Sequence, residues 1–215
     1  LREYWPIRVA ADDPARLYRT VRAGTDLEMF ILDTRQYRSR NIDQDGPAKT
    51  MLGEKQLQWL LRGLTESSAT WKVIVTTVPL SISKGGSASV PGNDGWAGGP
   101  GIPGFERERQ VIVDHILGRR VKNVVFLAGD VHHVQASVYD PNGDGTPDFH
   151  EFVAGPLSAV AGKPTSASVG LRPTTLVNEG GYMNFGLIRV TESSFDVRVL
   201  DEDGATRFSH HLSAR

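Results

Sequence analysis

The residues best suited to chemistry follow the most continuous apolar stretch of the chain, residues 123–128. Asp130 and His132 lie two positions apart, and His133 comes next. On an extended backbone, side chains two residues apart point the same way, so this carboxylate and imidazole would converge. Such a pair suits zinc, manganese or iron and can form one wall of a two-metal site. The alternative is that Asp130 caps a turn and the histidines bond locally, because an Asp-x-His pattern alone has low specificity.

Two other apolar stretches also end in polar residues. Residues 28–32 are followed by Asp33-Thr34-Arg35, and the stretch 72–80 contains Thr76-Thr77. Polar residues after one strand are ordinary turn chemistry. In open α/β sheets, however, ligands bind at the C-terminal edge of the strands. Polar groups after three strands therefore predict a site at that edge.

A second acidic pattern lies further along the chain and matches the calcium-loop sequence D-x-[DN]-x-[DN]-G-x5-E. The elements expected on both sides are strands rather than the usual helices, and two prolines stiffen the loop. The pattern predicts either a structural calcium site separate from catalysis or a hairpin made of ordinary turn formers. The matching residues are Asp140, Asn142, Asp144 and Glu151, with Asp148 at the ninth position.

Composition excludes several classes of protein. Lys and Arg total 24 against 25 Asp and Glu, so no strong basic field indicates a nucleic-acid partner. The absence of cysteine excludes disulfides, zinc-thiolate sites and thiol nucleophiles. No apolar run approaches the ~18 residues of a membrane span. The G-x-G-x-x-G match at 99–104 follows no strand and contains two prolines, so a dinucleotide site is not expected there.

The elements that must position these residues alternate between strand and helix. This order predicts a single α/β unit, a sheet with helices packed against it, followed by a β-rich C-terminal tail. Segments 84–104 and 155–181 are expected to be mostly loop, and segment 1–23 is expected to be irregular or partly helical. The predicted strands are 28–32, 72–80, 123–128, 135–139, 151–154, 185–190, 195–200 and 206–212, and the predicted helices are 53–64 and 105–117.

Six motifs in one order resemble the C-terminal half of the PhoD-like alkaline phosphatases. The PhoD-like phosphatases are a branch of the calcineurin-like metallophosphoesterases, and their members include phospholipase-D-type phosphodiesterases. The resemblance runs from about Tyr4 into the β tail and is far more specific than any single motif. The motifs are Asp33–Arg38, Gly53-x-x-Gln56-x-x-Trp59-Leu60, Trp71–Ile74, Asp94-x-Trp96-x-Gly98, Asn123–His132 and Glu151–Ser158.

The resemblance implies that residues 1–215 are the C-terminal portion of a metallophosphatase domain, part of a four-layer α-β-β-α sandwich. It implies Fe(3+) and Ca(2+) at the sheet edge, with Asp130 on the calcium side and His132 on the iron side. It also implies that a metal-activated hydroxide hydrolyses phosphate mono- or diesters. The implied location is extracytoplasmic, secreted or periplasmic, although the start of the chain has no signal-peptide pattern.

The resemblance suggests further roles, each with a plainer alternative. Arg35 is expected to hold a phosphate oxygen, or else to form a structural ion pair. Asp33 is expected to orient Arg35 or His132 through a hydrogen bond, or else to bind a metal ion itself. His133 is a candidate for protonating the leaving oxygen, or it simply packs. Trp96 either walls the substrate pocket or anchors its loop in the core.

Two departures from the family pattern limit these expectations. A metal-binding His of the wider superfamily is replaced here by Thr76 and Thr77. The family also takes most of its ligands from an N-terminal half whose motifs are missing, and a two-metal centre needs roughly six to eight protein ligands. We therefore expect a separate N-terminal segment of the same protein to complete the site. The chain starts at Leu1 without an initiator Met, which fits a longer gene product. The alternative function is a non-catalytic, calcium-stabilised β-rich binding module.

Overall fold

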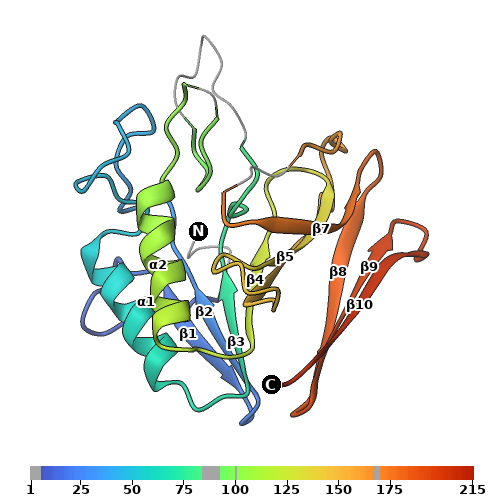
Figure 1. The fold of residues 1–215 in the computed structure, drawn as a ribbon, viewed down its shortest axis with the longest axis horizontal. Coiled ribbons are helices and arrows are strands. Elements are labelled where there is room, and N and C mark those ends of the chain that lie inside the picture. The colour runs from blue at the N-terminus through green and yellow to red at the C-terminus, as the bar shows by residue number, and fades with distance from the viewer. Residues whose placement is uncertain (1–5, 84–92, 100, 167–169) are drawn as a thin grey trace.

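The computed structural model describes residues 6–83, 93–99, 101–166 and 170–215, and its centre is a seven-stranded sheet (Figure 1). The strand order is β1-β2-β3-β4-β6-β5-β7. Strands β2, β3, β4 and β6 are mutually parallel, whereas β1, β5 and β7 run antiparallel to their neighbours. The C-terminal ends of the parallel strands therefore meet at one edge. The strands are β1 (Arg19–Ala23), β2 (Leu27–Ile31), β3 (Trp71–Val75), β4 (Val124–Ala128), β5 (Val134–Tyr139), β6 (Phe149–Val153) and β7 (Pro173–Glu179).

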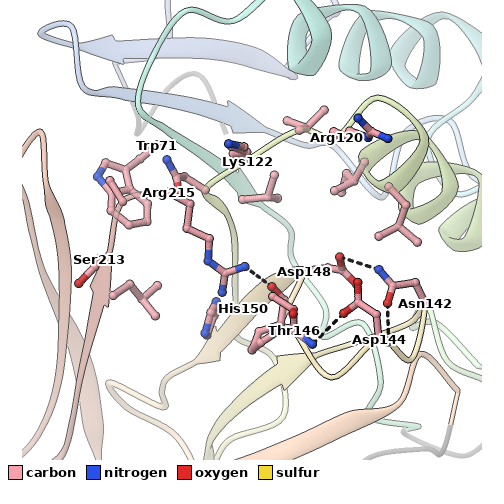
Figure 2. Close-up of a pocket in the computed structure, with 18 of the residues that line it drawn as sticks. Trp71, Arg120, Lys122, Asn142, Asp144, Thr146, Asp148, His150, Ser213 and Arg215 are labelled. Atoms are coloured by element: carbon pink, nitrogen blue, oxygen red, sulfur yellow. Dashed lines mark hydrogen bonds between the residues drawn. The ribbon is translucent and has the colours of Figure 1, made fainter.

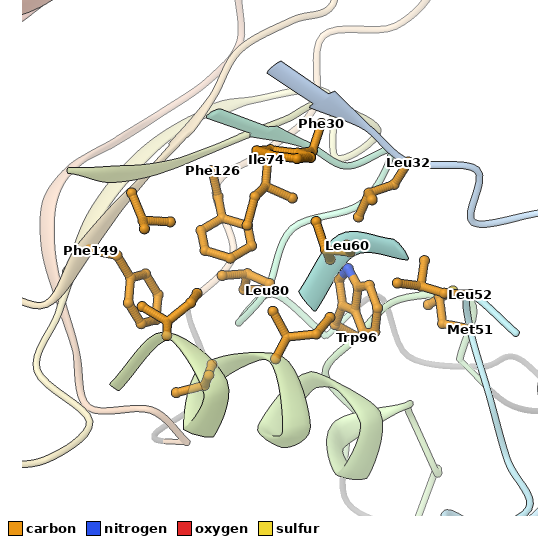
Figure 3. Close-up of a cluster of buried hydrophobic side chains, with 14 of the residues drawn as sticks. Phe30, Leu32, Met51, Leu52, Leu60, Ile74, Leu80, Trp96, Phe126 and Phe149 are labelled. Atoms are coloured by element: carbon orange, nitrogen blue, oxygen red, sulfur yellow. The ribbon is translucent and has the colours of Figure 1, made fainter. Parts of the chain in front are cut away.

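Two helices, α1 (Glu54–Glu66) and α2 (Glu106–Gly118), cover one face of this sheet (Figure 1). In α1 the buried residues Gln56, Leu60 and Leu64 recur every four positions, so they form one stripe along the helix. The stripe packs into a core that contains Phe30, Ile74, Phe126 and Phe149 from four sheet strands (Figure 3). This core fixes the helices, and with them the connections that lead to the strand ends.

A three-stranded antiparallel sheet covers the other face, with the order β10-β9-β8. A second core lies between the two sheets, where Val73, Val125 and Phe152 meet Phe195 and Val197. Because β4 is buried on both faces, its sequence is apolar throughout instead of alternating. The described residues thus form three layers, helix, sheet and sheet, and the predicted α/β class with a β-rich C-terminal region is confirmed. The strands of the smaller sheet are β8 (Asn184–Val190), β9 (Ser194–Asp201) and β10 (Thr206–Ser213).

Three predictions of local structure were wrong. The strand expected at 72–80 ends at Val75, where the Thr76 hydroxyl bonds the Val78 carbonyl and the chain turns away. Strands β1 and β7 lie in segments expected to be irregular. Both are edge strands of the larger sheet, and most of their residues are exposed, so no apolar alternation marks them. Residues 84–92 of the predicted long loop lie outside the described residues. No helix in the described part of the chain is long and apolar enough to span a membrane.

Candidate functional site

Four connections leave the sheet at the C-terminal edge of β2, β3, β4 and β6. Backbone pairing continues for one residue beyond β2 and β3, with the Leu32 N–H donating to the Val75 carbonyl and the Thr76 N–H donating to the Leu127 carbonyl, both at 2.9 Å. Beyond that, the Thr34 and Thr77 hydroxyls share a hydrogen bond between the first two connections. The polar strand ends that the sequence singled out therefore lie at one edge, and two of them are in contact.

Asp33 is buried and shapes the connection that follows β2. Its Oδ1 accepts hydrogen bonds from the backbone N–H groups of Arg35 at 2.9 Å and Gln36 at 3.1 Å. Within the described part of the chain its Oδ2 has no hydrogen-bond partner. Asp33 thus orients Arg35 through the backbone rather than through the guanidinium. No hydrogen bond joins it to His132 among the residues that the structure describes.

Arg35 reaches partly into solvent beside a second arginine. Its side chain is 48% exposed, and its Nη2 lies 3.3 Å from Asp94 Oδ2. Arg38 Nη1 donates to the Asp94 carbonyl at 3.5 Å, and burial, followed by the charge of Arg35, lowers the pKa of Arg38. An exposed pair of this kind contributes about 0–1 kcal/mol. The ion pair foreseen as the alternative for Arg35 therefore exists, and an incoming anion can displace Asp94 at little cost.

Asp130 and His132 follow β4 on an unusual backbone. Their φ angles are 74° and 60°, in the left-handed region, so the expectation of an extended backbone that makes both side chains converge was wrong. Non-glycine residues in this region cost about 1–3 kcal/mol each, and such strain is concentrated at functional sites. Asp130 is half-buried and His132 is exposed. The Gly162 N–H donates to the His132 carbonyl at 2.6 Å, and a Cβ on Gly162 would lie 2.8 Å from that oxygen.

His133 points into the protein and is 1% exposed. Its Nδ1 lies 3.0 Å from the Val131 carbonyl oxygen, a geometry in which Nδ1 carries the proton. Its Nε2 is buried and has no hydrogen-bond partner in the described ranges. Among the described residues, no three His, Cys, Asp or Glu side chains are placed to hold a metal ion. The Asp130 carboxylate and the exposed His132 imidazole are donor types that suit a metal ion, but within the described ranges they form at most part of a metal centre.

Trp96 is buried in the core that α1 and α2 form with the sheet, and does not line a substrate pocket (Figure 3). Its indole N–H donates to Thr76 Oγ1 at 3.1 Å, which ties the connection after β3 to the strand end. The prediction that Trp96 walls the substrate pocket was therefore wrong, and the alternative, a loop anchor, is what the structure contains.

The predicted calcium loop lies at the opposite end of β6 from Asp130. The Asp140 carboxylate accepts N–H groups from the loop itself, including Gly145 at 2.9 Å, and Asn142 Nδ2 donates to Asp148 Oδ1 at 3.2 Å. Asn142, Asp144 and Asp148 also line a cavity of about 680 Å³ (Figure 2). A calcium ion in this loop stays a prediction.

Glu151 does not belong to that loop. It is buried in β6, where it accepts the Tyr139 hydroxyl at 2.6 Å and the Leu80 N–H at 2.7 Å. Burial raises the pKa of Glu151 to about 7. The sequence pattern supplied this residue as the last calcium ligand, and the structure corrects that assignment.

The sequence and the fold of the chain are similar to those of known phosphatases. Residues 1–197 match the family model described as PhoD-like phosphatase. Alkaline phosphatase D of Bacillus subtilis (strain 168) is 33% identical over 150 residues, which are 63% of this chain and 25% of that protein. A solved structure of PhoD superposes with a TM-score of 0.69 at 24% identity, covering 99% of this chain and 44% of the other. The purple acid phosphatase PPD1 from yellow lupin (Lupinus luteus) seeds gives a TM-score of 0.55 at 14% identity, over 96% of this chain and 34% of the other. The chain thus spans less than half the length of each of these relatives.

Proposed function

Because this chain belongs to the PhoD-like phosphatase family, we propose that the protein hydrolyses phosphate mono- or diesters at the C-terminal edge of the seven-stranded sheet. The observation that supports this most is that the parallel strands β2, β3, β4 and β6 end at one edge of the sheet. Arg35 follows β2 there, and Asp130 and His132 follow β4. Ligands of α/β sheets bind at such an edge.

Asp130 and His132 are the metal-holding residues of this proposal, with calcium and iron as the ions by family resemblance. When bound, such cations neutralise charge on the phosphoryl group and lower the pKa of the attacking water. The described donors are too few for two ions, so the proposal includes a further N-terminal segment of the same protein that supplies the remaining ligands.

Arg35 is the phosphate-binding residue of this proposal. Its planar group of N–H donors matches two oxygens of a phosphate, and Asp33 holds the backbone from which the side chain departs. An arriving phosphate ester takes the place of Asp94, and the charge of Arg38 beside it adds to the attraction. These residues bind and orient the ester for in-line attack.

His133 is a poor candidate for the proton donor. A general acid must come within hydrogen-bond reach of the leaving oxygen, whereas His133 is buried and its Nδ1 is committed to the Val131 carbonyl. Its alternative role, packing behind the site, agrees better with its position. The leaving oxygen then takes its proton from water or from a residue outside the described part of the chain.

The competing function is a non-catalytic, calcium-stabilised binding module. It is favoured by the incomplete donor set and by the preformed turn from Asp140 to Gly145. Location outside the cytoplasm is part of our first proposal and rests on family resemblance alone.

The two functions are separated by reconstitution of the full-length protein. The protein is stripped of metal, supplied with iron and calcium, and assayed with p-nitrophenyl phosphate and bis-p-nitrophenyl phosphate. We expect hydrolysis to return only with metal. If the reconstituted protein hydrolyses neither ester but is stabilised by calcium, the enzyme proposal fails and the binding module replaces it.

A further inference from the structure

A buried carboxamide holds the connection that follows β2. Gln56 lies in the first turn of α1 and is 1% exposed. Its Oε1 accepts the Asp33 N–H at 2.7 Å, and its Nε2 donates to the Asp33 carbonyl at 2.8 Å and to the Leu52 carbonyl at 2.9 Å. Gln56 therefore binds both the N–H and the carbonyl of Asp33, and both of its N–H donors are used.

A second carboxamide holds the connection that follows β6 in the same way. Asn184 begins β8 in the smaller sheet and is 2% exposed. Its Oδ1 accepts the Gly155 N–H at 2.7 Å, and its Nδ2 donates to the Gly155 carbonyl at 2.9 Å. Its own backbone N–H donates to the Pro156 carbonyl at 2.9 Å.

The two contacts are equivalent in position as well as in chemistry. Asp33 and Gly155 are each the second residue after their strands, which end at Ile31 and Val153. In the sheet, β2 and β6 lie on the two sides of the β3-β4 pair. One carboxamide comes from the helical layer and the other from the smaller sheet, so each covering layer is attached at one flank of the candidate site.

Each carboxamide is also linked to a residue of that site, Gln56 through Asp33 and Asn184 through the connection from Gly155 to Gly162. Gln56 fixes Asp33, whose carboxylate holds the Arg35 N–H at 2.9 Å. Asn184 fixes Gly155, the start of the connection whose residue Gly162 holds the His132 carbonyl at 2.6 Å. We propose that Gln56 and Asn184 are positioning residues that fix the two flanking connections, and with them Arg35 and His132. The catalytic part of this inference rests on the proposed phosphoesterase function.

The chemistry of the contact gives a sharp test at Gln56. Gln56→Met keeps the length and approximate volume of the side chain but removes both bonds to Asp33. Gln56→Glu keeps the shape, yet its ionised carboxylate faces the carbonyls of Asp33 and Leu52, and protonation restores one donor. A residue that only fills space tolerates Met at every pH. If Gln56 is a positioning residue, Gln56→Met loosens the connection at every pH, whereas Gln56→Glu regains the wild-type behaviour when its carboxyl group is protonated.

Hydrogen exchange and kinetics are measured on the full-length protein. For Gln56→Met, we expect faster exchange confined to residues 32–38 and a roughly tenfold rise in KM for p-nitrophenyl phosphate with a smaller change in kcat, because Arg35 acts in binding. For Gln56→Glu, the faster exchange and the higher KM, each compared with the wild-type protein at the same pH, should both shrink as the pH is lowered from 8 to 5. For Asn184→Leu, faster exchange should be confined to residues 155–162, with kcat rather than KM reduced.

Two results would overturn the proposal. One is unchanged exchange at both connections in the Met and Leu variants. The other is exchange that rises throughout the chain in step with a fall in Tm and without acid rescue of Gln56→Glu, which would make both residues ordinary parts of the core. If the wild-type protein hydrolyses no ester but the local exchange pattern appears, the proposed function fails while the positioning of the connections stands.

Discussion

Glu151 provides a quantitative test of the core that supports the candidate site. It is buried in β6 and accepts hydrogen bonds from the Tyr139 hydroxyl and the Leu80 N–H. Burial raises its pKa from 4.5 to about 7, while the two hydrogen bonds and the charge of Arg109 oppose that rise. We predict that Glu151→Gln flattens the dependence of stability on pH.

The magnitude follows from the two pKa values. The folded protein keeps a proton on Glu151 that the unfolded chain releases between about pH 4.5 and pH 7. The stability that this proton brings is therefore complete below pH 4.5 and is lost as the pH rises through 7. At about 1.4 kcal/mol per pH unit, the difference between the two pKa values corresponds to about 3 kcal/mol.

The assay is urea unfolding of wild-type protein and Glu151→Gln at pH 5 and pH 8, followed by circular dichroism. Between these pH values the wild type should lose about 2–3 kcal/mol more unfolding free energy than the variant, because the other titrating groups are common to both. Tyr139→Phe is the matched control. Tyr139→Phe removes a hydrogen bond that lowers the pKa of Glu151. Between pH 5 and pH 8 this variant should therefore lose at least as much unfolding free energy as the wild type. Equal pH dependence in wild type and Glu151→Gln would refute the reasoning.

Three further substitutions test individual assignments. Arg35→Lys keeps the charge but loses the planar set of donors, so we expect KM for p-nitrophenyl phosphate to rise about tenfold; an unchanged KM would leave Arg35 only its ion pair with Asp94. Trp96→Phe removes the donor to Thr76 and keeps most of the packing, so the unfolding free energy should fall by about 1 kcal/mol without a change in KM; a higher KM would return Trp96 to the substrate pocket. Asp144→Asn should weaken calcium binding, measured by calorimetry, about tenfold while leaving Tm in EDTA unchanged; a wild-type protein that binds no calcium there would have an ordinary hairpin.

Elements with strong burial patterns could be predicted from the sequence, and elements without them could not. Strand β4 is apolar throughout because both of its faces are covered, and α1 carries a regular buried stripe. Strands β1 and β7 lie at the sheet edges with mostly exposed residues, so nothing in their composition separates them from loops. Patterns reveal burial, and edge strands have little of it.

The candidate site shows the same division. Its place at the strand ends could be predicted, because parallel strands bring their C-terminal ends to one edge. The left-handed backbone at Asp130 and His132 could not, since neither residue is the glycine that signals such a conformation. Glu151 matched a calcium-loop spacing, yet strand alternation points it into the core with Phe149. Each spacing rule assumes a backbone conformation, an extended one for the Asp130 and His132 pair and a single loop for the calcium pattern. The actual backbone differs in both places.

The central claim is that Asp130 holds a metal ion at the sheet edge, and the metal content of Asp130→Asn tests it most directly. Asparagine tolerates a φ of 74° better than most residues, so the variant changes the charge of the side chain while preserving its shape and backbone. Full-length wild-type and variant proteins are loaded with iron and calcium, dialysed, and analysed for both metals by mass spectrometry, with Tm measured alongside. We predict that the variant keeps its Tm without metal and loses bound ion together with hydrolysis. A variant that retains the wild-type metal content would contradict the account.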